Sequence, residues 1–337
     1  MWKNFSVSQQ SLGFQMPQEQ VKRHSNGERS HKARHEVRVG DAYDLAETVD
    51  ASTVDLLITS PPYWGLRTYG LEHNWDILAA WKKSGRSQTD PPSYDWYRRN
   101  GGILGLEPLP EWYLKHLVEI LDKFARSLKP SGSMWINIGD VYFSRWASIR
   151  PEGRQGLGDT SRLRRRGPMG GFRQEKNLLL LPSRFAIHMQ ELRWIVRNDL
   201  IWFKPNVPPR PERDRLRLCH EHFFHLVKRP SEGRAKYYYD LSEVEAGAHD
   251  VVLCNVRSGE DGHSATFPED IVRPRIASSS PPGGVVLDPF CGTGRALVAA
   301  ARSGRQTIGF EISDRFAEVA RKSIANLTLG ESRCQIT

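Results

Sequence analysis

The feature that most restricts the fold is a succession of patterns near the C-terminal end of the chain. Two short apolar runs predict buried strands, and a glycine-rich turn and an alanine-rich helix lie between them, in the order Val285–Asp288, Pro289–Gly294, Arg295–Arg302 and Thr307–Glu311. A strand, a helix and a second strand in this order predict a parallel βαβ unit. We therefore expect an α/β fold in which two carboxylates, Asp288 and Glu311, end strands close to a tight turn.

The turn and the two carboxylates favour one kind of ligand. Glycines let the backbone approach a ligand closely, and Glu311, 23 residues after Asp288, is suited to accept both hydroxyls of a ribose. A dinucleotide site needs G-x-G-x-x-G, whereas Gly294 is followed here by Arg295-Ala296-Leu297. Asp288 would repel a pyrophosphate but suits an ammonium or hydroxyl group. A ligand with a cationic amino acid and an adenosine fits both carboxylates, and that ligand is S-adenosylmethionine.

A second strand end carries polar and aromatic groups. The apolar run Val54–Ile58 predicts a buried strand, and the proline pair within Thr59–Trp64 ends it because proline cannot continue a sheet ladder. Open α/β sheets bind ligands at the carboxyl ends of their strands. A hydroxyl, two rigid prolines and aromatic rings at that edge suit a flat polar ring such as a nucleobase. A strand-terminating turn with a packed tyrosine is the alternative.

Further periodic segments complete the expected core. Strands are predicted at Glu36–Asp41, Ser133–Asp140, Trp194–Phe203 and Glu221–Lys228, and helices at Pro110–Leu128, from Pro182 onward and after Ser313. The segment Lys129–Gly132 is expected to stop the first of these helices. Asp41 at a strand end could accept a ligand N–H group or cap the helix that starts near Tyr43, and the two roles are compatible.

Two long tracts without sustained periodicity interrupt this pattern. Residues 65–108 interleave basic residues with aromatic ones, and residues 145–176 contain nine basic residues against three acidic ones. The whole chain has a formal net charge of +9. Cations suit phosphates and rings suit base stacking, so both tracts predict contacts with nucleic acid; a solvated loop is the alternative for each.

Composition excludes several other classes of protein. The 337 residues, 39% of them hydrophobic, suffice for one large α/β domain with insertions or for two domains. The four cysteines form no C-x-x-C pair, which argues against a zinc site or a disulfide framework. His220, His222 and His225 do not share one strand face, so they do not indicate a metal site. No apolar run approaches the ~18 residues of a membrane helix, and we expect a soluble protein of a reducing compartment.

The motifs together resemble those of amino-group DNA methyltransferases. Asp288–Gly294 resembles their cofactor motif, and Thr59–Tyr63 resembles their catalytic tetrapeptide. In this family the tetrapeptide is usually Asp-Pro-Pro-Tyr in N6-adenine enzymes and Ser-Pro-Pro-Tyr in N4-cytosine enzymes, so Ser60–Tyr63 looks like the cytosine-N4 signature. Because the catalytic motif precedes the cofactor motif, the order looks like the permuted β subgroup. Asp199–Asn206 and Tyr237–Asp240 also resemble segments of this family.

The resemblance implies a circularly permuted, Rossmann-like, S-adenosylmethionine-dependent methyltransferase fold. Its sheet would be mixed but mostly parallel, with inserted DNA-recognition loops. The implied organisation is a polar N-terminal arm (1–35), a catalytic domain (36–330) with inserts at 65–108 and 145–176, a target-recognition region within 205–262, and a short tail (331–337).

Site residues follow from the same resemblance. The catalytic set is Ser60, Pro61, Pro62 and Tyr63. The cofactor-binding set is Asp41, His263, Thr266, Phe267, Pro268, Asp288, Pro289, Phe290, Gly292, Thr293, Gly294 and Glu311. DNA contacts are expected from Arg67, Arg164, Arg165 and Arg166, and no metal is expected.

The implied activity is methyl transfer from S-adenosylmethionine to the N4 amine of a flipped cytosine in double-stranded DNA. The implied setting is restriction-modification, or phage or host DNA modification, in a prokaryotic cytoplasm. A cognate restriction endonuclease is the expected partner, and the chain is expected to be a monomer or a homodimer. Two alternatives stay open: N6-adenine methylation, and a non-catalytic regulator that binds nucleic acid.

Overall fold

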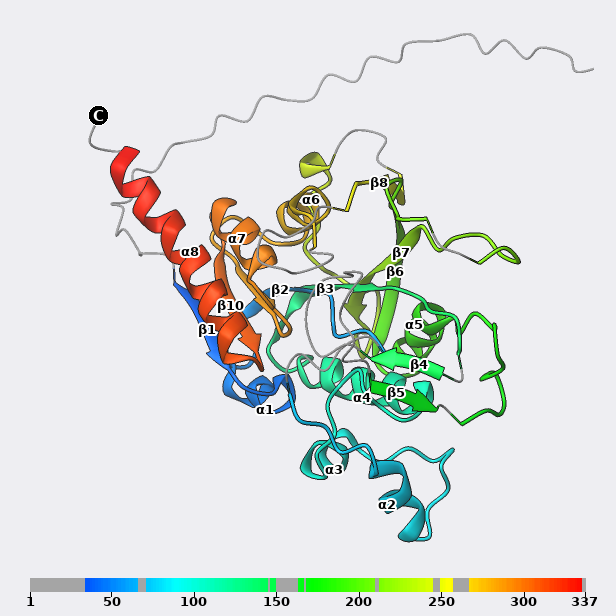
Figure 1. Cartoon of the computed structure of the whole chain (residues 1–337). Coiled ribbons are helices and arrows are strands. Elements are labelled where there is room, and N and C mark those ends of the chain that lie inside the picture. Colours follow the sequence, from blue (N-terminus) through cyan, green and yellow to red (C-terminus); the bar gives the residue numbers. More distant parts are fainter. Residues whose placement is uncertain are drawn as a thin grey trace, which may run out of the picture. The chain divides into compact units, whose positions relative to one another are not determined.

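Eight strands form one mixed sheet, and the order of its strands brings distant parts of the chain together (Figure 1). A computed structural model describes residues 34–334, except 66–70, 145, 150–162, 167, 210–211, 245–248 and 257–266. Across the sheet the strands are β1 (His35–Val39), β10 (Gln306–Glu311), β9 (Val285–Asp288), β2 (Val54–Thr59), β3 (Leu128–Ile138), β7 (His220–Lys228), β6 (Trp194–Phe203) and β8 (Val251–Leu253). The first five are mutually parallel, and β7 runs antiparallel to both β3 and β6. The predicted α/β fold with a mixed, mostly parallel sheet is confirmed.

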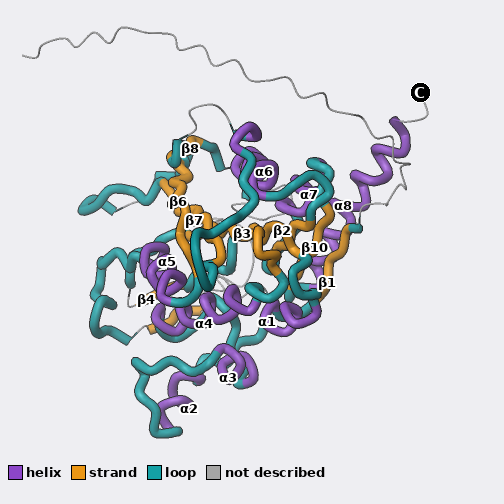
Figure 2. The backbone as a smooth tube through the Cα atoms, turned by 180° about the vertical axis from the view of Figure 1, so that it is seen from behind, coloured by secondary structure: helices purple, strands orange, loops and turns teal. Residues whose placement is uncertain are grey.

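Helices cover both faces of this sheet, as both views show (Figures 1 and 2). One face carries α1 (Ala42–Leu45), α4 (Pro110–Lys123) and α5 (Leu181–Glu191), and the other carries α6 (Glu269–Ser279), α7 (Arg295–Arg302) and α8 (Asp314–Cys334). Short 3-10 helices lie at Ala46–Thr48 and Leu241–Glu243, and β4 (Trp146–Ile149) pairs with β5 (Leu163–Arg166) as a separate hairpin. None of the described helices is long and apolar enough to cross a membrane.

The central strand β2 is buried along its whole length, as a parallel strand covered on both faces should be. Its one charged residue, Asp55, accepts hydrogen bonds from Lys129 Nζ (2.8 Å) and from the backbone N–H of Val285 (2.9 Å). One prediction for the segment that contains Lys129 is wrong. The segment expected to stop a helix, Lys129–Gly132, belongs to β3, and the preceding helix α4 already ends at Lys123.

The insert at 65–108 is more ordered than its irregular sequence predicts. It contains α2 (Ile77–Lys83) and α3 (Tyr94–Arg99). Trp81 and Tyr97 are buried and pack against Trp112 of α4, with ring centroids 6.1 and 6.3 Å away. These two rings are therefore part of the same hydrophobic core as residues of α4, β2 and β3, and they do not form the open stacking surface that the sequence suggested.

The end of the insert is held by a buried carboxylate, and its backbone carbonyls bind the segment that follows β2. Glu107 is fully buried and accepts from the N–H of Gly105 (2.8 Å), and its Oε1 lies 3.1 Å from Nδ1 of His116. The carbonyl of Glu107 accepts from the indole of Trp64 (2.9 Å), and Gly65 N donates to the carbonyl of Gly105 (2.7 Å). Both ends of the insert thus meet beside the tetrapeptide.

We predict that Glu107→Ala lowers the free energy of unfolding by about 3 kcal/mol, because it leaves buried polar groups without partners. Urea denaturation would measure the loss. Glu47→Ala is the matched control, since this exposed carboxylate pairs with Lys123 on the surface and its removal should leave the unfolding midpoint nearly unchanged. Equal midpoints for the two variants would contradict the assigned role of Glu107.

Candidate active site

Four adjacent parallel strands bring the predicted polar groups to one edge of the sheet. Asp41 follows β1, Glu311 ends β10, Asp288 ends β9 and Ser60 follows β2. The register pairs Val39 with Glu311, so β1 and β10 end level with each other, and it pairs Asp288 with Gly309, so β9 ends two residues earlier. Residues that are remote in sequence therefore form one row along the carboxyl edge.

The glycine-rich turn after β9 serves two different purposes. Gly294 has a φ of +80°, and a Cβ there would lie 2.8 Å from Cβ of Ala320 in α8, so this glycine permits close helix packing. Gly292 has a φ of +52°, and nothing lies within 4 Å of where its Cβ would be. The N–H of Gly292 donates to Oε2 of Glu311 (2.9 Å). The backbone thus leaves free space directly beside the Glu311 carboxylate.

Asp288 and Glu311 are carboxylates in a poorly solvated place. Asp288 is 4% exposed and accepts from Thr59 Oγ1 (2.5 Å) and from the N–H of Phe290 (3.1 Å). Burial raises its pKa to about 7, partly offset by these two donors. Burial also raises the pKa of Glu311, against which its backbone N–H donors work. Such a pair favours a ligand that brings a positive charge or hydroxyl donors.

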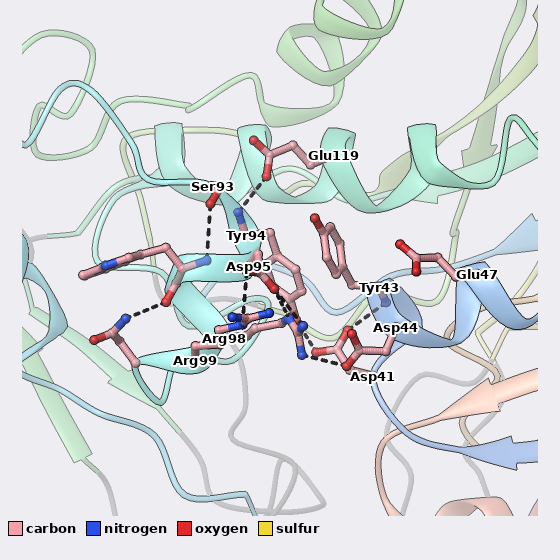
Figure 3. A network of polar contacts seen from close by, with 12 residues as sticks. Asp41, Tyr43, Asp44, Glu47, Ser93, Tyr94, Asp95, Arg98, Arg99 and Glu119 are labelled. Atoms are coloured by element: carbon pink, nitrogen blue, oxygen red, sulfur yellow. Dashed lines mark hydrogen bonds and ion pairs between the residues drawn. The ribbon is translucent and has the colours of Figure 1, made fainter.

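Asp41 has the capping role that the sequence indicated. Its Oδ1 accepts from the N–H of Tyr43 (2.8 Å) at the start of α1, and its Oδ2 accepts from Oη of Tyr94 (2.7 Å) in the insert (Figure 3). Burial raises the pKa of Asp41. Each oxygen accepts one of these bonds, and a carboxylate oxygen can accept a second, so a ligand contact by Asp41 stays compatible with the cap.

The tetrapeptide is held by residues that sequence reasoning missed. Tyr63 Oη donates to Glu221 Oε2 (2.7 Å) and accepts from Asn137 Nδ2 (2.7 Å), and Ser60 Oγ donates to it over 3.3 Å. Lys204 forms an ion pair with Glu221. Burial, together with the negative charge of Glu221, raises the pKa of the Tyr63 hydroxyl, which therefore stays protonated.

Comparison with known proteins identifies the kind of chain. Residues 54–322 match the family N6_N4_Mtase, described as DNA methylase. The type II methyltransferase M.SmaI of Serratia marcescens is 33% identical over 296 residues, which cover 85% of this chain and 89% of that protein. M.Cfr9I of Citrobacter freundii is 32% identical over 289 residues, or 83% and 84% of the two chains. The chain belongs to this DNA methylase family.

Solved structures agree on the fold. The PvuII DNA methyltransferase, titled cytosine-N4-specific, superposes on this DNA methylase with a TM-score of 0.59 at 17% identity, covering 86% of each chain. The M1.HpyAVI–SAM complex superposes with a TM-score of 0.51 at 17% identity, covering 86% of this chain and 98% of that one. The predicted membership of the amino-group DNA methyltransferases is confirmed. The chain is therefore an enzyme, and its substrate is DNA.

The remaining predicted site residues are placed only in part. Pro268 caps α6, and the Phe267 ring contacts Phe223 of β7 edge to face at 5.3 Å. Pro289, Phe290 and Thr293 belong to the turn between β9 and α7. Arg164, Arg165 and Arg166 form β5 opposite β4. Arg67, His263 and Thr266 lie outside the described residues.

We predict a distinctive pH dependence from Asp288. The pKa of Asp288 is about 7 in the folded chain, compared with the ordinary 3.8. Between these two pH values the folded state binds more protons than the unfolded state. The stability of the ligand-free protein therefore falls as the pH rises from about 4 to 7. At about 1.4 kcal/mol per pKa unit, the loss is on the order of 4 kcal/mol. Asp288→Asn keeps the acceptor for Thr59 and Phe290 but cannot ionise, so its stability should fall less. Urea unfolding of both proteins across this pH range would measure the difference. If the free energy of unfolding fell equally with pH in the wild type and in Asp288→Asn, the burial argument would be contradicted.

Proposed function

We propose that this DNA methylase transfers a methyl group from S-adenosylmethionine to the N4 amine of a flipped cytosine in double-stranded DNA. The observation that carries the proposal is the position of Ser60-Pro61-Pro62-Tyr63 directly after β2, the neighbour of the strand β9 that ends at the carboxylate Asp288. A serine in this place, rather than an aspartate, supports cytosine as the base. The PvuII enzyme of the same fold, titled cytosine-N4-specific, supports the same choice.

The cofactor is assigned to the edge formed by β1, β10 and β9. We assign Glu311 to the ribose hydroxyls, Asp288 to the ammonium group and Asp41 to the adenine amine. Pro289, Phe290, Gly292, Thr293 and Gly294 would pass close to it, and His263, Thr266, Phe267 and Pro268 would lie over the methionine moiety. The fit rests on two observations: buried carboxylates with raised pKa values, and open space at Gly292. When bound, S-adenosylmethionine supplies an electrophilic methyl group.

The tetrapeptide would prepare the amine for attack. A cytosine inside a duplex must be flipped, at a cost of a few kcal/mol, and the Tyr63 ring would stack on it. The N4 amine is a poor nucleophile because its lone pair is delocalised into the ring. The Ser60 hydroxyl and the Pro61 carbonyl would accept hydrogen bonds from its two N–H groups. This favours a more tetrahedral nitrogen whose lone pair is aimed at the methyl group, with positioning as the main contribution.

Glu221 and Asn137 would act as positioning residues in this scheme. Both hydrogen-bond to Tyr63 Oη, so the ring cannot rotate away from the Ser60 side chain without breaking buried bonds. No cysteine nucleophile is needed. Cys291 in the cofactor turn is buried, and burial raises its pKa, so it stays a thiol.

We also propose which residues contact DNA, which partner the enzyme has and in which kind of cell it acts. Arg67, Arg164, Arg165, Arg166 and the region 205–262 are assigned to DNA contact because the chain's excess charge is basic. The type II methyltransferase relatives from bacteria support restriction-modification, with a cognate endonuclease, in a prokaryotic cytoplasm. Monomer and homodimer both fit the proposal.

We predict that expression in a methylation-deficient bacterium yields N4-methylcytosine, detected by mass spectrometry of DNA digested to nucleosides. N6-methyladenine would overturn the choice of base. Ser60→Ala is the control: it should reduce turnover on the order of a hundredfold while leaving the affinity for S-adenosylmethionine nearly unchanged. An equal loss of cofactor affinity would remove Ser60 from its assigned role.

A further inference from the structure

The insert at 65–108 reaches the proposed cofactor edge through one hydroxyl. Tyr94, the first residue of α3, is 3% exposed, and its Oη donates to Oδ2 of Asp41 over 2.7 Å (Figure 3). The other oxygen of Asp41 is occupied by the N–H of Tyr43. Within the part of the chain that the structure describes, Tyr94 is the one side chain that donates to Asp41. The direction of this carboxylate is therefore set jointly by α1 and by the insert.

Several contacts hold Tyr94 in place. Its N–H donates to Oε2 of Glu119 in α4 (2.6 Å), and its ring lies 5.4 Å from that of Tyr43 and 5.5 Å from that of His116. One turn later Arg98 Nη1 donates to Oδ2 of Asp44 in α1 (2.6 Å). Helix α3 is thus attached to α1 at two points, one of them the carboxylate at the end of β1 (Figure 3).

We propose that Tyr94 is a positioning residue for the cofactor, and that its hydroxyl orients the Asp41 carboxylate toward the adenine amine. The inference rests on the proposed function, because Asp41 is there assigned to adenine. A carboxylate held by two donors loses little freedom when a ligand binds, so less of the binding free energy is spent on ordering it. Since coupling between sites is reciprocal, a bound cofactor also stabilises the attachment of α3 to α1.

The test compares two tyrosines of the same helix. Tyr94→Phe removes only the hydroxyl that reaches Asp41. Tyr97→Phe is the matched control, because Tyr97 is also buried in α3 but its Oη donates to the carbonyl of Ile103 within the insert (3.1 Å). We expect Tyr94→Phe to raise the Kd for S-adenosylhomocysteine about tenfold, with kcat at saturating S-adenosylmethionine within about twofold of wild type. Tyr97→Phe should leave the Kd within about twofold.

Two results would overturn the proposal: an unchanged Kd in Tyr94→Phe, or an equal rise in Tyr97→Phe, which would indicate general loosening of the insert. Asp41→Asn separates this failure from that of the proposed function, because asparagine retains the cap of α1. If Asp41→Asn weakens binding and Tyr94→Phe does not, only the positioning role is wrong. If Asp41→Asn binds like wild type, the assignment of Asp41 to adenine is wrong as well. The double variant should be no weaker than Asp41→Asn alone.

Hydrogen exchange provides the reciprocal readout. In the wild-type protein, S-adenosylhomocysteine should slow amide exchange in Tyr94–Arg99, although these residues are assigned no contact with it. In Tyr94→Phe this protection should be lost, while protection of the turn after β9 persists at saturating ligand. Equal protection of α3 in both proteins would contradict the coupling.

Discussion

One buried hydrogen bond joins the two halves of the site. Thr59 Oγ1 at the end of β2 donates to Oδ1 of Asp288 at the end of β9, over 2.5 Å. Thr59 is fully buried and Asp288 nearly so, and the strands that carry them are neighbours in the sheet. The bond therefore fixes the residue before the tetrapeptide relative to the residue before the glycine-rich turn. Methyl transfer depends on the alignment of donor and acceptor, and this bond aligns the segments assigned to each.

The buried carboxylates at the same edge are only partly stabilised when no ligand is bound. Burial raises the pKa values of Asp41, Asp288 and Glu311, and their donors are backbone N–H groups and hydroxyls rather than cations. Uncompensated burial of carboxylates costs stability, and a ligand with an ammonium group and several hydroxyls returns part of that cost. The proposed cofactor has these groups. The stability that the free protein loses by burying these carboxylates therefore contributes to its affinity for that ligand.

The sequence predicted the regular core well because its signals are local. The bounds of α7, β6 and β9 match the predicted ones, since alternating or continuous apolar runs and flanking glycines determine them. Helix α6 was missed, because Pro274 lies inside it and its polar residues hide the helical period. The segment Lys129–Gly132 was misread, since it lies within β3 at a shift of the register with β2, where the Lys129 side chain forms an ion pair with Asp55. Tertiary contacts, and not local propensity, determine the structure of both segments.

The site was predicted where motifs are contiguous and missed where it depends on pairing between distant segments. Asp288, Glu311 and Ser60 follow from strand ends, whereas Asn137 and Glu221 meet Tyr63 only because β3 lies between β2 and β7. Likewise, nothing in the sequence of the insert indicates that Tyr94 reaches Asp41, 53 residues earlier.

A structure of the protein with S-adenosylhomocysteine bound would show directly whether the cofactor and the tetrapeptide meet at the carboxyl edge of the sheet. We expect the ribose hydroxyls at Glu311, the amino group at Asp288, and the sulfur facing the Ser60-Pro61-Pro62-Tyr63 segment, with the bond between Thr59 and Asp288 intact. A ligand bound away from the ends of β9 and β10, or a broken Thr59–Asp288 bond in the complex, would contradict it.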